Sequence, residues 1–326
     1  MSNPLIVATA HGLIIYEQQG PAWHEIARGL TDHNVTSVIA REGVILAGTT
    51  SGIYRSDDLG QSWRAVSTGL TLPHVRWLAY DPNVSDAEFA GTEPAGIFVS
   101  RDGAETWQTC PEVADLRDAH GWFLPYSPEA GCVRGFAFHG RRVYAAVEVG
   151  GVLRSDDGGD TWRLAGGSSG NPDFGRVVPA NFVHADVHSI AVHPTSPDLV
   201  FAPTGGGFYG SSDGGNSWSC LYPHCYCRAV WLDPQDANHL IIGPANSVSR
   251  GGRIEESRDG GHTWQLSSSG QDVPWPHHMV ERFTQVEDNL YAVLSNGHLL
   301  VAPMATLQWQ PVLPNLDSVT AVTSMG

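Results

Sequence analysis

Ser155-Asp156-Asp157-Gly158-Gly159-Asp160-Thr161-Trp162 is an eight-residue segment that returns along most of the chain with small changes. Its pattern is S-x-D-x-G-x-[ST]-W, and further copies run from Ser56 to Trp63, Ser100 to Trp107, Ser211 to Trp218 and Ser257 to Trp264. Each copy follows an alternating apolar run, which is typical of a β-strand. Because Asp accepts hydrogen bonds from nearby backbone N–H groups and Gly tolerates positive φ, each copy predicts a tight turn after a strand.

Tryptophan residues indicate that the repeat occurs seven times. Trp23, Trp63, Trp107, Trp162, Trp218, Trp264 and Trp309 are separated by 40, 44, 55, 56, 46 and 45 residues. Within a unit, four short alternating runs occur, as expected for the four strands of one blade of a β-propeller. We therefore expect seven blades, two of which carry degenerate copies of the segment at Trp23 and Trp309.

The two ends of the chain predict how the repeats close. The run Ser318–Thr323 has the pattern of a first strand without a second, and Leu5–Thr9 has that of a second strand without a first. Pairing them would complete a blade and remove two exposed sheet edges. The prediction is an all-β, seven-bladed β-propeller closed by N-terminal strands pairing with the C-terminal strand, one domain over residues 1–326. Its blades are expected at about 35–70, 75–110, 133–166, 187–222, 227–268, 280–313, and 318–326 with 4–28.

The repeated segment resembles the BNR or Asp-box repeat, which is found in sialidases, in other glycoside-hydrolase-like propellers, in sortilin-type receptors and in the photosystem II assembly factor. In glycosidases of this kind the box is a structural turn, so the resemblance implies the fold directly. It implies two very different functions, hydrolysis and protein assembly, because one fold can host many activities.

Composition excludes several functions. The chain has 326 residues and a formal net charge of −16, and all 18 of its basic residues are Arg. Such an acidic protein is a poor partner for nucleic acid or an anionic membrane, and without Lys it has neither a Schiff-base residue nor a P-loop. Five Cys without a framework spacing and an N-terminus without a signal-peptide pattern predict a reducing, cytoplasmic location. No apolar run approaches the length of a membrane span.

One column of polar residues follows an apolar residue at the start of each blade. It contains Thr36, Arg76, Arg134, His188, Arg228, Glu281 and Thr320. Unpaired charge is costly in a dry core, so seven polar residues at one strand position favour the wall of a wet central channel.

Three arginines of this column predict an anionic ligand. Guanidinium groups match carboxylates and phosphates bidentately, so Arg76, Arg134 and Arg228 are candidate substrate-binding residues. Sialidases use an arginine triad on a carboxylate, but the present chain has seven repeats where sialidases have six blades, and it lacks a Phe-Arg-Ile-Pro motif. In the alternative interpretation the three arginines pair with Glu93, Glu148 and Glu281.

Histidines near the same column suggest a metal site. His184, His224 and His277 each precede the aligned apolar residue by three positions in consecutive blades, and His188 lies in the column itself. Imidazoles gathered in this way could hold Zn²⁺ or another divalent metal. The alternative is that they are ordinary loop histidines, since no HExxH or paired CxxC spacing is present.

The candidate catalytic residues are Glu93, Glu148, His188 and Glu281. A glycosidase needs two carboxylates about 5–5.5 Å or 6.5–9.5 Å apart, and Asp186 is a further candidate for such a pair. A lyase or lactonase would instead use His188 or a Tyr as its base. The long insertions 110–131, 164–185 and 244–253 are predicted to wall a pocket, with Trp122 and Tyr226 contacting the substrate and with the aromatic and basic residues Tyr126, Phe174 and Arg176 nearby.

Together these patterns predict a hydrolase or lyase that acts on an anionic, carboxylate-bearing or sugar-like small molecule. One alternative is a non-catalytic propeller that grips a partner protein. A second alternative is an enzyme that depends on a His-ligated divalent metal.

Overall fold

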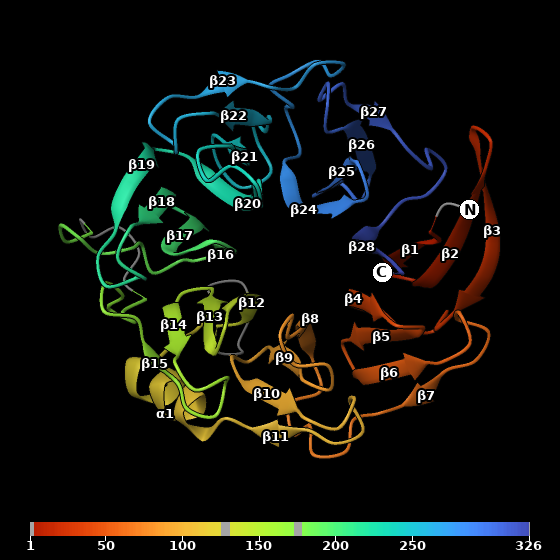
Figure 1. Ribbon diagram of the computed structural model, residues 1–326, viewed down its shortest axis with the longest axis horizontal. Helices are drawn as coiled ribbons and strands as arrows, with labels where there is room; N and C mark the ends of the chain where they lie inside the picture. The colour runs from red at the N-terminus through yellow and green to blue at the C-terminus, as the bar shows by residue number, and fades with distance from the viewer. Residues whose placement is uncertain (1–2, 125–130, 173–177, 326) are drawn as a thin grey trace. The chain divides into compact units, whose positions relative to one another are not determined.

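The computed structural model describes residues 3–124, 131–172 and 178–325 of the protein. These residues form seven four-stranded sheets, and the described strand pairings are antiparallel. This is the predicted seven-bladed β-propeller, an all-β fold (Figure 1). The chain divides into two compact units. Unit one comprises residues 1–92, 98–109 and 283–326, and unit two comprises residues 93–97 and 110–282.

Unit one holds two complete sheets and the greater part of two more. Their strands are, in sheet order, β28 (Val319–Ser324), β1 (Leu5–Thr9), β2 (Gly12–Gln19) and β3 (Ala22–Gly29); β4 (Val35–Arg41), β5 (Val44–Thr49), β6 (Gly52–Ser56) and β7 (Arg64–Ala65); β8 (Val75–Tyr80), β9 (Glu88–Thr92), β10 (Ile97–Ser100) and β11 (Gln108–Thr109); β24 (Val280–Val286), β25 (Asn289–Leu294), β26 (Leu299–Pro303) and β27 (Gln310–Pro311).

Unit two holds the three remaining sheets. These are β12 (Val133–His139), β13 (Arg142–Val147), β14 (Gly151–Ser155) and β15 (Arg163–Leu164); β16 (Ala191–His193), β17 (Ser196–Thr204), β18 (Gly207–Ser211) and β19 (Ser219–Pro223); β20 (Tyr226–Leu232), β21 (Leu240–Ala245), β22 (Glu255–Ser257) and β23 (Gln265–Leu266). The observed sheets follow the predicted blade order, whereas the prediction of a single domain stays a prediction.

The sheet that joins both ends of the chain has the predicted strand order. β28 runs antiparallel to β1, with Ile6 opposite Thr323 and Val7 opposite Val322 (Figure 1). Ala321 packs with Ile6 in one apolar cluster of unit one. The N-terminal strand therefore obtains its inner neighbour from the C-terminal end, as the incomplete repeats at the two ends predicted.

The repeated eight-residue segments form the predicted turns. In the third blade the Asp157 carboxylate accepts hydrogen bonds from the Ser155 hydroxyl (2.7 Å) and from the Thr161 backbone N–H (2.9 Å) and hydroxyl (2.6 Å). The Trp162 indole N–H donates to the Gly159 carbonyl at 3.1 Å, and Gly158 and Gly159 adopt positive φ. Burial opposes ionisation of Asp157, but the hydrogen bonds from Thr161 and Ser155 outweigh it and lower its pKa to about 2.

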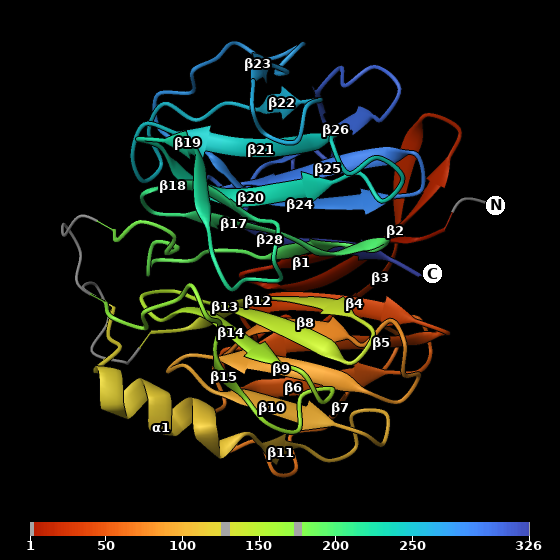
Figure 2. The same cartoon turned by 60° about the vertical axis from the view of Figure 1, so that its left-hand side comes forward.

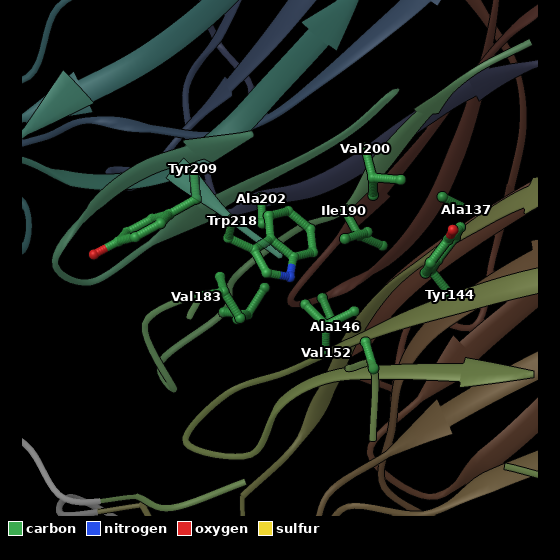
Figure 3. Packing of buried hydrophobic residues seen from close by; sticks show 12 residues of the cluster. Ala137, Tyr144, Ala146, Val152, Val183, Ile190, Val200, Ala202, Tyr209 and Trp218 are labelled. Atoms are coloured by element: carbon green, nitrogen blue, oxygen red, sulfur yellow. The ribbon is translucent and has the colours of Figure 1, made fainter. Parts of the chain in front are cut away.

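Apolar side chains between blades three and four fix the backbone that carries the candidate site. Figure 3 shows Trp218 and Val183 packing with residues of β13, β14, β17 and β18. Val187 belongs to the same cluster and is completely buried. Because successive residues of an extended chain point to opposite sides, burial of Val187 directs both of its neighbours away from this core.

The inner strand of blade four is shorter than the sequence predicted. β16 covers only Ala191–His193, while Val187 forms an isolated bridge with Thr204. The His188 N–H donates to the Pro203 carbonyl at 2.9 Å. Proline has no N–H to return a ladder hydrogen bond, so the pairing is interrupted at this point.

The first long insertion contains a helix that the sequence analysis did not predict. α1 (Pro111–His120) begins with Pro at its first turn and is capped at its C-terminal end by Gly121, whose φ is 65°. It contacts β15 of the same unit (Figure 2). Within the described residues, no helix has both the length and the apolar character that crossing a membrane requires.

Candidate functional site

Seven side chains of unit two form one connected group, here called the polar cluster. Its members are Arg134, Glu148, Asp186, His188, Tyr226, Arg228 and Glu281. They come from β12, from the turn after β13, from the segment before β16, from β20 and from the start of β24. Next to them in sequence, Val133, Val187, Cys227 and Val280 are each 0% exposed. The alternation predicted for the inner strands therefore places four members of the polar column together.

Both arginines of the cluster are paired with carboxylates. Arg134 contacts Glu148 Oε2 at 3.1 Å and Glu281 Oε2 at 3.4 Å, and Arg228 contacts Glu281 Oε1 at 2.5 Å. Burial would raise the pKa of Glu281, but Arg228 and Arg134 outweigh it and lower that pKa. The structure therefore shows Arg134 and Arg228 paired with glutamates, as the alternative interpretation of the sequence predicted. Anion binding by these two residues stays a prediction.

His188 lies at the centre of a second group of contacts. Its Nδ1 is 2.8 Å from the Cys227 carbonyl, which can only accept, so Nδ1 carries a proton. Its Nε2 lies 3.2 Å from the Tyr226 hydroxyl, 3.2 Å from Asp186 Oδ1 and 4.0 Å from Glu148 Oε1. The Nε2 atom therefore faces a hydroxyl and two carboxylate oxygens.

Tyr226 connects the two groups of contacts. Its hydroxyl oxygen accepts from Arg228 Nε at 3.3 Å and Nη2 at 3.0 Å, which leaves the hydroxyl proton for His188 Nε2. Burial, opposed by Arg228, raises the pKa of Tyr226 to about 12. Tyr226 is therefore a neutral hydrogen-bond donor across the physiological pH range.

Glu148 uses its two carboxylate oxygens differently. Oε2 accepts from Arg134 and from the Cys132 thiol, which lies 3.2 Å away, while Oε1 faces His188. The side chain of Glu148 is only 3% exposed. The sequence analysis missed Cys132, although its place just before the aligned pair Val133-Arg134 could have indicated it.

The predicted histidine metal set is not the one that the structure assembles. His224 and His277 are exposed, and the half-buried His184 accepts the Asp186 backbone N–H on Nδ1 at 3.1 Å. Burial lowers the pKa of His184, which is therefore neutral near pH 7. Among the described residues, the one set of three close potential ligands is Glu148, Asp186 and His188, whose ligand atoms lie within 4.8 Å of one another. Only His188 of the predicted set belongs to it.

Trp122 is a packing residue and not the wall of an open pocket. It is 1% exposed, and its indole N–H donates to the Gly170 carbonyl at 2.6 Å. A Cβ on Gly150 would lie only 2.9 Å from the indole, so the ring is closely covered on that side. In this conformation the surface of Trp122 is covered by the protein itself, and substrate contact by Trp122 stays a prediction.

Two further predicted residues, Arg76 and Glu93, are not members of the polar cluster. Arg76 lies in β8 and belongs to unit one. Glu93 lies between β9 and β10 and is 9% exposed. Tyr126, Phe174 and Arg176 lie outside the described residues.

The polar cluster combines acid, base and anion-binding groups in a small, largely buried space. It carries three carboxylates and two guanidinium groups, so one negative charge is in excess when His188 is neutral. Burying charge without compensation is costly, and perturbed groups of this kind gather at functional sites. The arrangement could transfer protons, hold an anion or bind a cation.

Comparison with known proteins gives distant relatives. No family model matches the chain. A xyloglucanase of Paenibacillus sp. is 24% identical over 278 residues, which are 72% of this chain and 25% of the relative. The chain thus spans about a quarter of that relative's length.

Solved structures give the same fold in two functional settings. The GH74 xyloglucanase from Xanthomonas campestris superposes with a TM-score of 0.60 and 18% identity, over 86% of this chain and 45% of that one. YCF48 bound to D1 peptide has a TM-score of 0.60 and 15% identity, over 90% and 85% of the two chains. The comparisons therefore confirm the seven-bladed β-propeller and its likeness to glycoside-hydrolase-like propellers.

Proposed function

We propose that this protein is a hydrolase or lyase that acts on a sugar-like molecule at the polar cluster. The observation that carries the proposal is the contact of His188 Nε2 with both the Tyr226 hydroxyl and the Asp186 carboxylate, each at 3.2 Å. A propeller needs no such arrangement for stability, because an apolar core would avoid the desolvation of these groups.

The cluster offers distinct roles to its residues. Asp186, His188 and Glu148 form a corner with three potential proton-accepting or ligand atoms, which would activate a water molecule or a substrate hydroxyl. Tyr226 supplies a neutral O–H donor beside them. Arg134 and Arg228 would orient an anionic substrate group if it displaced Glu281 from either guanidinium.

The sugar-like substrate is supported by the relatives. The named activity of the curated Paenibacillus relative and of the Xanthomonas campestris structure is that of a xyloglucanase. The present chain covers only part of each protein, so a glycan substrate for this chain is part of the proposal.

The test is an activity screen with matched variants. Purified protein is incubated with xyloglucan oligosaccharides and with uronate-containing oligosaccharides, and products are followed by reducing-end assay and mass spectrometry. We expect turnover that falls about 100-fold or more in Glu148→Gln and in Asp186→Asn, as removal of a proton-transfer group does. Asp272→Asn, at an exposed position between β23 and β24, is the control and should retain full activity. No turnover of any substrate, or equal turnover in all variants, contradicts the proposal.

The alternative is a non-catalytic propeller that binds a protein segment. The similarity to YCF48 bound to D1 peptide favours it, because that match covers most of both chains. Saturable binding of a peptide that Arg228→Ala weakens, in a protein without turnover, would favour this alternative over the enzyme.

A further inference from the structure

We infer that Glu148, Asp186 and His188 bind one divalent transition-metal ion, such as Zn²⁺ or Mn²⁺, with the remaining coordination positions open. The inference concerns the same corner of the polar cluster as the proposed function, but it stands without turnover because metal binding is measured directly. The site differs from the four-histidine set that the sequence suggested.

The spacing of the three donor atoms suits a metal. Bonds of about 2.0–2.1 Å in a tetrahedral site hold ligand atoms about 3.3 Å apart. His188 Nε2 and Asp186 Oδ1 are already 3.2 Å apart. Glu148 Oε1 lies 4.0 Å from Nε2 and would need to approach Nε2 by about 0.7 Å for that spacing, and all three donor atoms lie within 4.8 Å of one another.

The imidazole is oriented as a metal ligand requires. The Cys227 carbonyl holds the proton on Nδ1, which leaves the Nε2 lone pair directed at the two carboxylates. A carbonyl that accepts from the other ring nitrogen is the usual outer partner of a metal-bound histidine, since it fixes the tautomer. Val187 and Cys227, both completely buried, hold the backbone on either side of this contact.

Both carboxylates are held with one oxygen on the side of the imidazole. Arg134 and the Cys132 thiol occupy Glu148 Oε2 and leave Oε1 on the side of His188. Gly205 has no side chain, and a Cβ at this position would lie 2.1 Å from Asp186 Oδ2. The close backbone therefore limits rotation of the Asp186 carboxylate and keeps Oδ1 toward His188.

Charge also favours a cation. The two arginines of the cluster compensate two of its three carboxylates, and among the described residues the ion-pair partner of Asp186 is His188. Without a cation, the two carboxylate oxygens would lie beside Nε2, to which the Tyr226 hydroxyl donates, in a space from which water is largely excluded. A metal ion would contact all three donor atoms at once, whereas a proton on Nε2 would lie within hydrogen-bond distance of only one of the two carboxylates, that of Asp186.

The donor types select the class of metal. Ca²⁺ and Mg²⁺ prefer sites made of oxygen atoms, while imidazole nitrogen favours transition metals. A set of one nitrogen and two oxygen atoms accordingly favours Zn²⁺ or Mn²⁺. Tyr226, whose hydroxyl lies beside Nε2, would then donate its proton to a carboxylate oxygen or to a metal-bound water.

The test is a direct titration of the full chain after treatment with chelator. Isothermal titration with ZnCl₂, MnCl₂, MgCl₂ and CaCl₂ should give one equivalent of bound Zn²⁺ or Mn²⁺ and much weaker binding of Mg²⁺ and Ca²⁺. His188→Gln, Asp186→Asn and Glu148→Gln should each weaken binding at least 10–100-fold. His224→Gln and His277→Gln, at exposed histidines outside the three-residue set, are the matched controls and should bind as the parent does.

Two further measurements keep the outcome unambiguous. Cys220 is an exposed thiol that could take up zinc, so Cys220→Ser is titrated in parallel. Mn²⁺ does not favour thiols, so its binding to the proposed site is followed by electron paramagnetic resonance. Circular dichroism of each variant shows whether it has folded, and the stoichiometry of the parent protein is independent of any variant.

The inference is overturned if the parent protein binds neither Zn²⁺ nor Mn²⁺ stoichiometrically, or if folded His188→Gln and Asp186→Asn bind them unchanged. A bound metal without turnover of any substrate would contradict the proposed function alone. Turnover that persists in chelator-treated protein that binds no metal would contradict the metal site alone.

Discussion

Asp186 Oδ1 lies 3.2 Å from His188 Nε2, and the two residues are separated in sequence only by Val187. Residues at positions i and i+2 of an extended chain point to the same side, and the residue between them points to the other. The buried Val187 therefore anchors one side of the chain while its two neighbours form the corner of the polar cluster.

Val187→Ala should loosen this corner through packing alone. The valine is completely buried, and burial of a Val side chain stabilises a protein by about 1.5–3 kcal/mol. We expect the free energy of unfolding to fall by about 1–2 kcal/mol in chemical denaturation, because alanine keeps part of the buried area. Val248→Ala, at a position that is 52% exposed, is the matched control. Equal stability of the two variants would contradict the anchoring role.

Glu281→Gln should destabilise the protein because Glu281 joins both arginines of the cluster. Breaking a buried pair costs about 3–5 kcal/mol, and the 19% exposure of the Glu281 side chain places the expected loss near 3 kcal/mol. Glu287→Gln, on the surface between β24 and β25, controls for the loss of one negative charge. A measured loss below about 0.5 kcal/mol would show that the arginines are satisfied by other groups.

Trp122→Ala should reduce stability and not ligand affinity alone. The indole is buried and hydrogen-bonded to Gly170, and truncation of a buried Trp costs about 3–5 kcal/mol. Phe123→Ala removes the neighbouring aromatic ring, which is 55% exposed, and should change the melting temperature little. If Trp122→Ala melted with the parent protein but lost substrate binding, Trp122 would be a substrate residue after all.

Acid should destabilise the turns of the repeated segments. Asp157 and Asp259 each have a folded-state pKa of about 2, below the ordinary value of 3.8. The unfolded chain therefore binds these protons first, and the stability that the two carboxylates provide is lost as the pH falls from about 4 to about 2. Thermal melts across this range should show a smaller pH dependence for Asp157→Asn than for the parent or for Asp272→Asn. An unchanged pH dependence would mean that other carboxylates govern acid unfolding.

Removal of residues 317–326 should prevent formation of the sheet that β28 shares with β1. The deletion leaves the inner edge of β1 unpaired and removes the buried Val322, which is only 3% exposed in the intact sheet. We expect loss of the cooperative thermal transition and a rise in aggregation, measured by circular dichroism and light scattering. A truncated protein that melted like the parent would show that β28 contributes little.

The repeats predicted the sheets because several local sequence features indicate the same structure. The alternating runs, the Asp and Gly of each turn and the Trp that follows all favour the same strand and turn. The aligned column likewise predicted that Arg134, His188, Arg228 and Glu281 would lie together, because strand alternation alone determines that relationship.

The partners of these residues could not be predicted in the same way. Two examples are the ion pairs of Arg134 with Glu148 and Glu281 and the hydrogen bond from His188 to the Cys227 carbonyl. These contacts depend on side-chain rotamers and on the stagger of neighbouring blades. Trp122 shows the same limit, because an aromatic residue in a long insertion has one sequence pattern whether it packs inward or faces a ligand. α1 was missed because only Val113 of its ten residues is buried, so it lacks a broad apolar face.

The pairing of Leu5 with Ser324 has a consequence for biosynthesis. A ribosome releases β1 first and its partner β28 more than 300 residues later, so an N-terminal strand waits with one side uncovered while all intervening blades are made. Contacts between such distant parts of a chain form slowly. Until these two strands join, a newly made molecule is therefore exposed to chaperones, proteases and domain swapping.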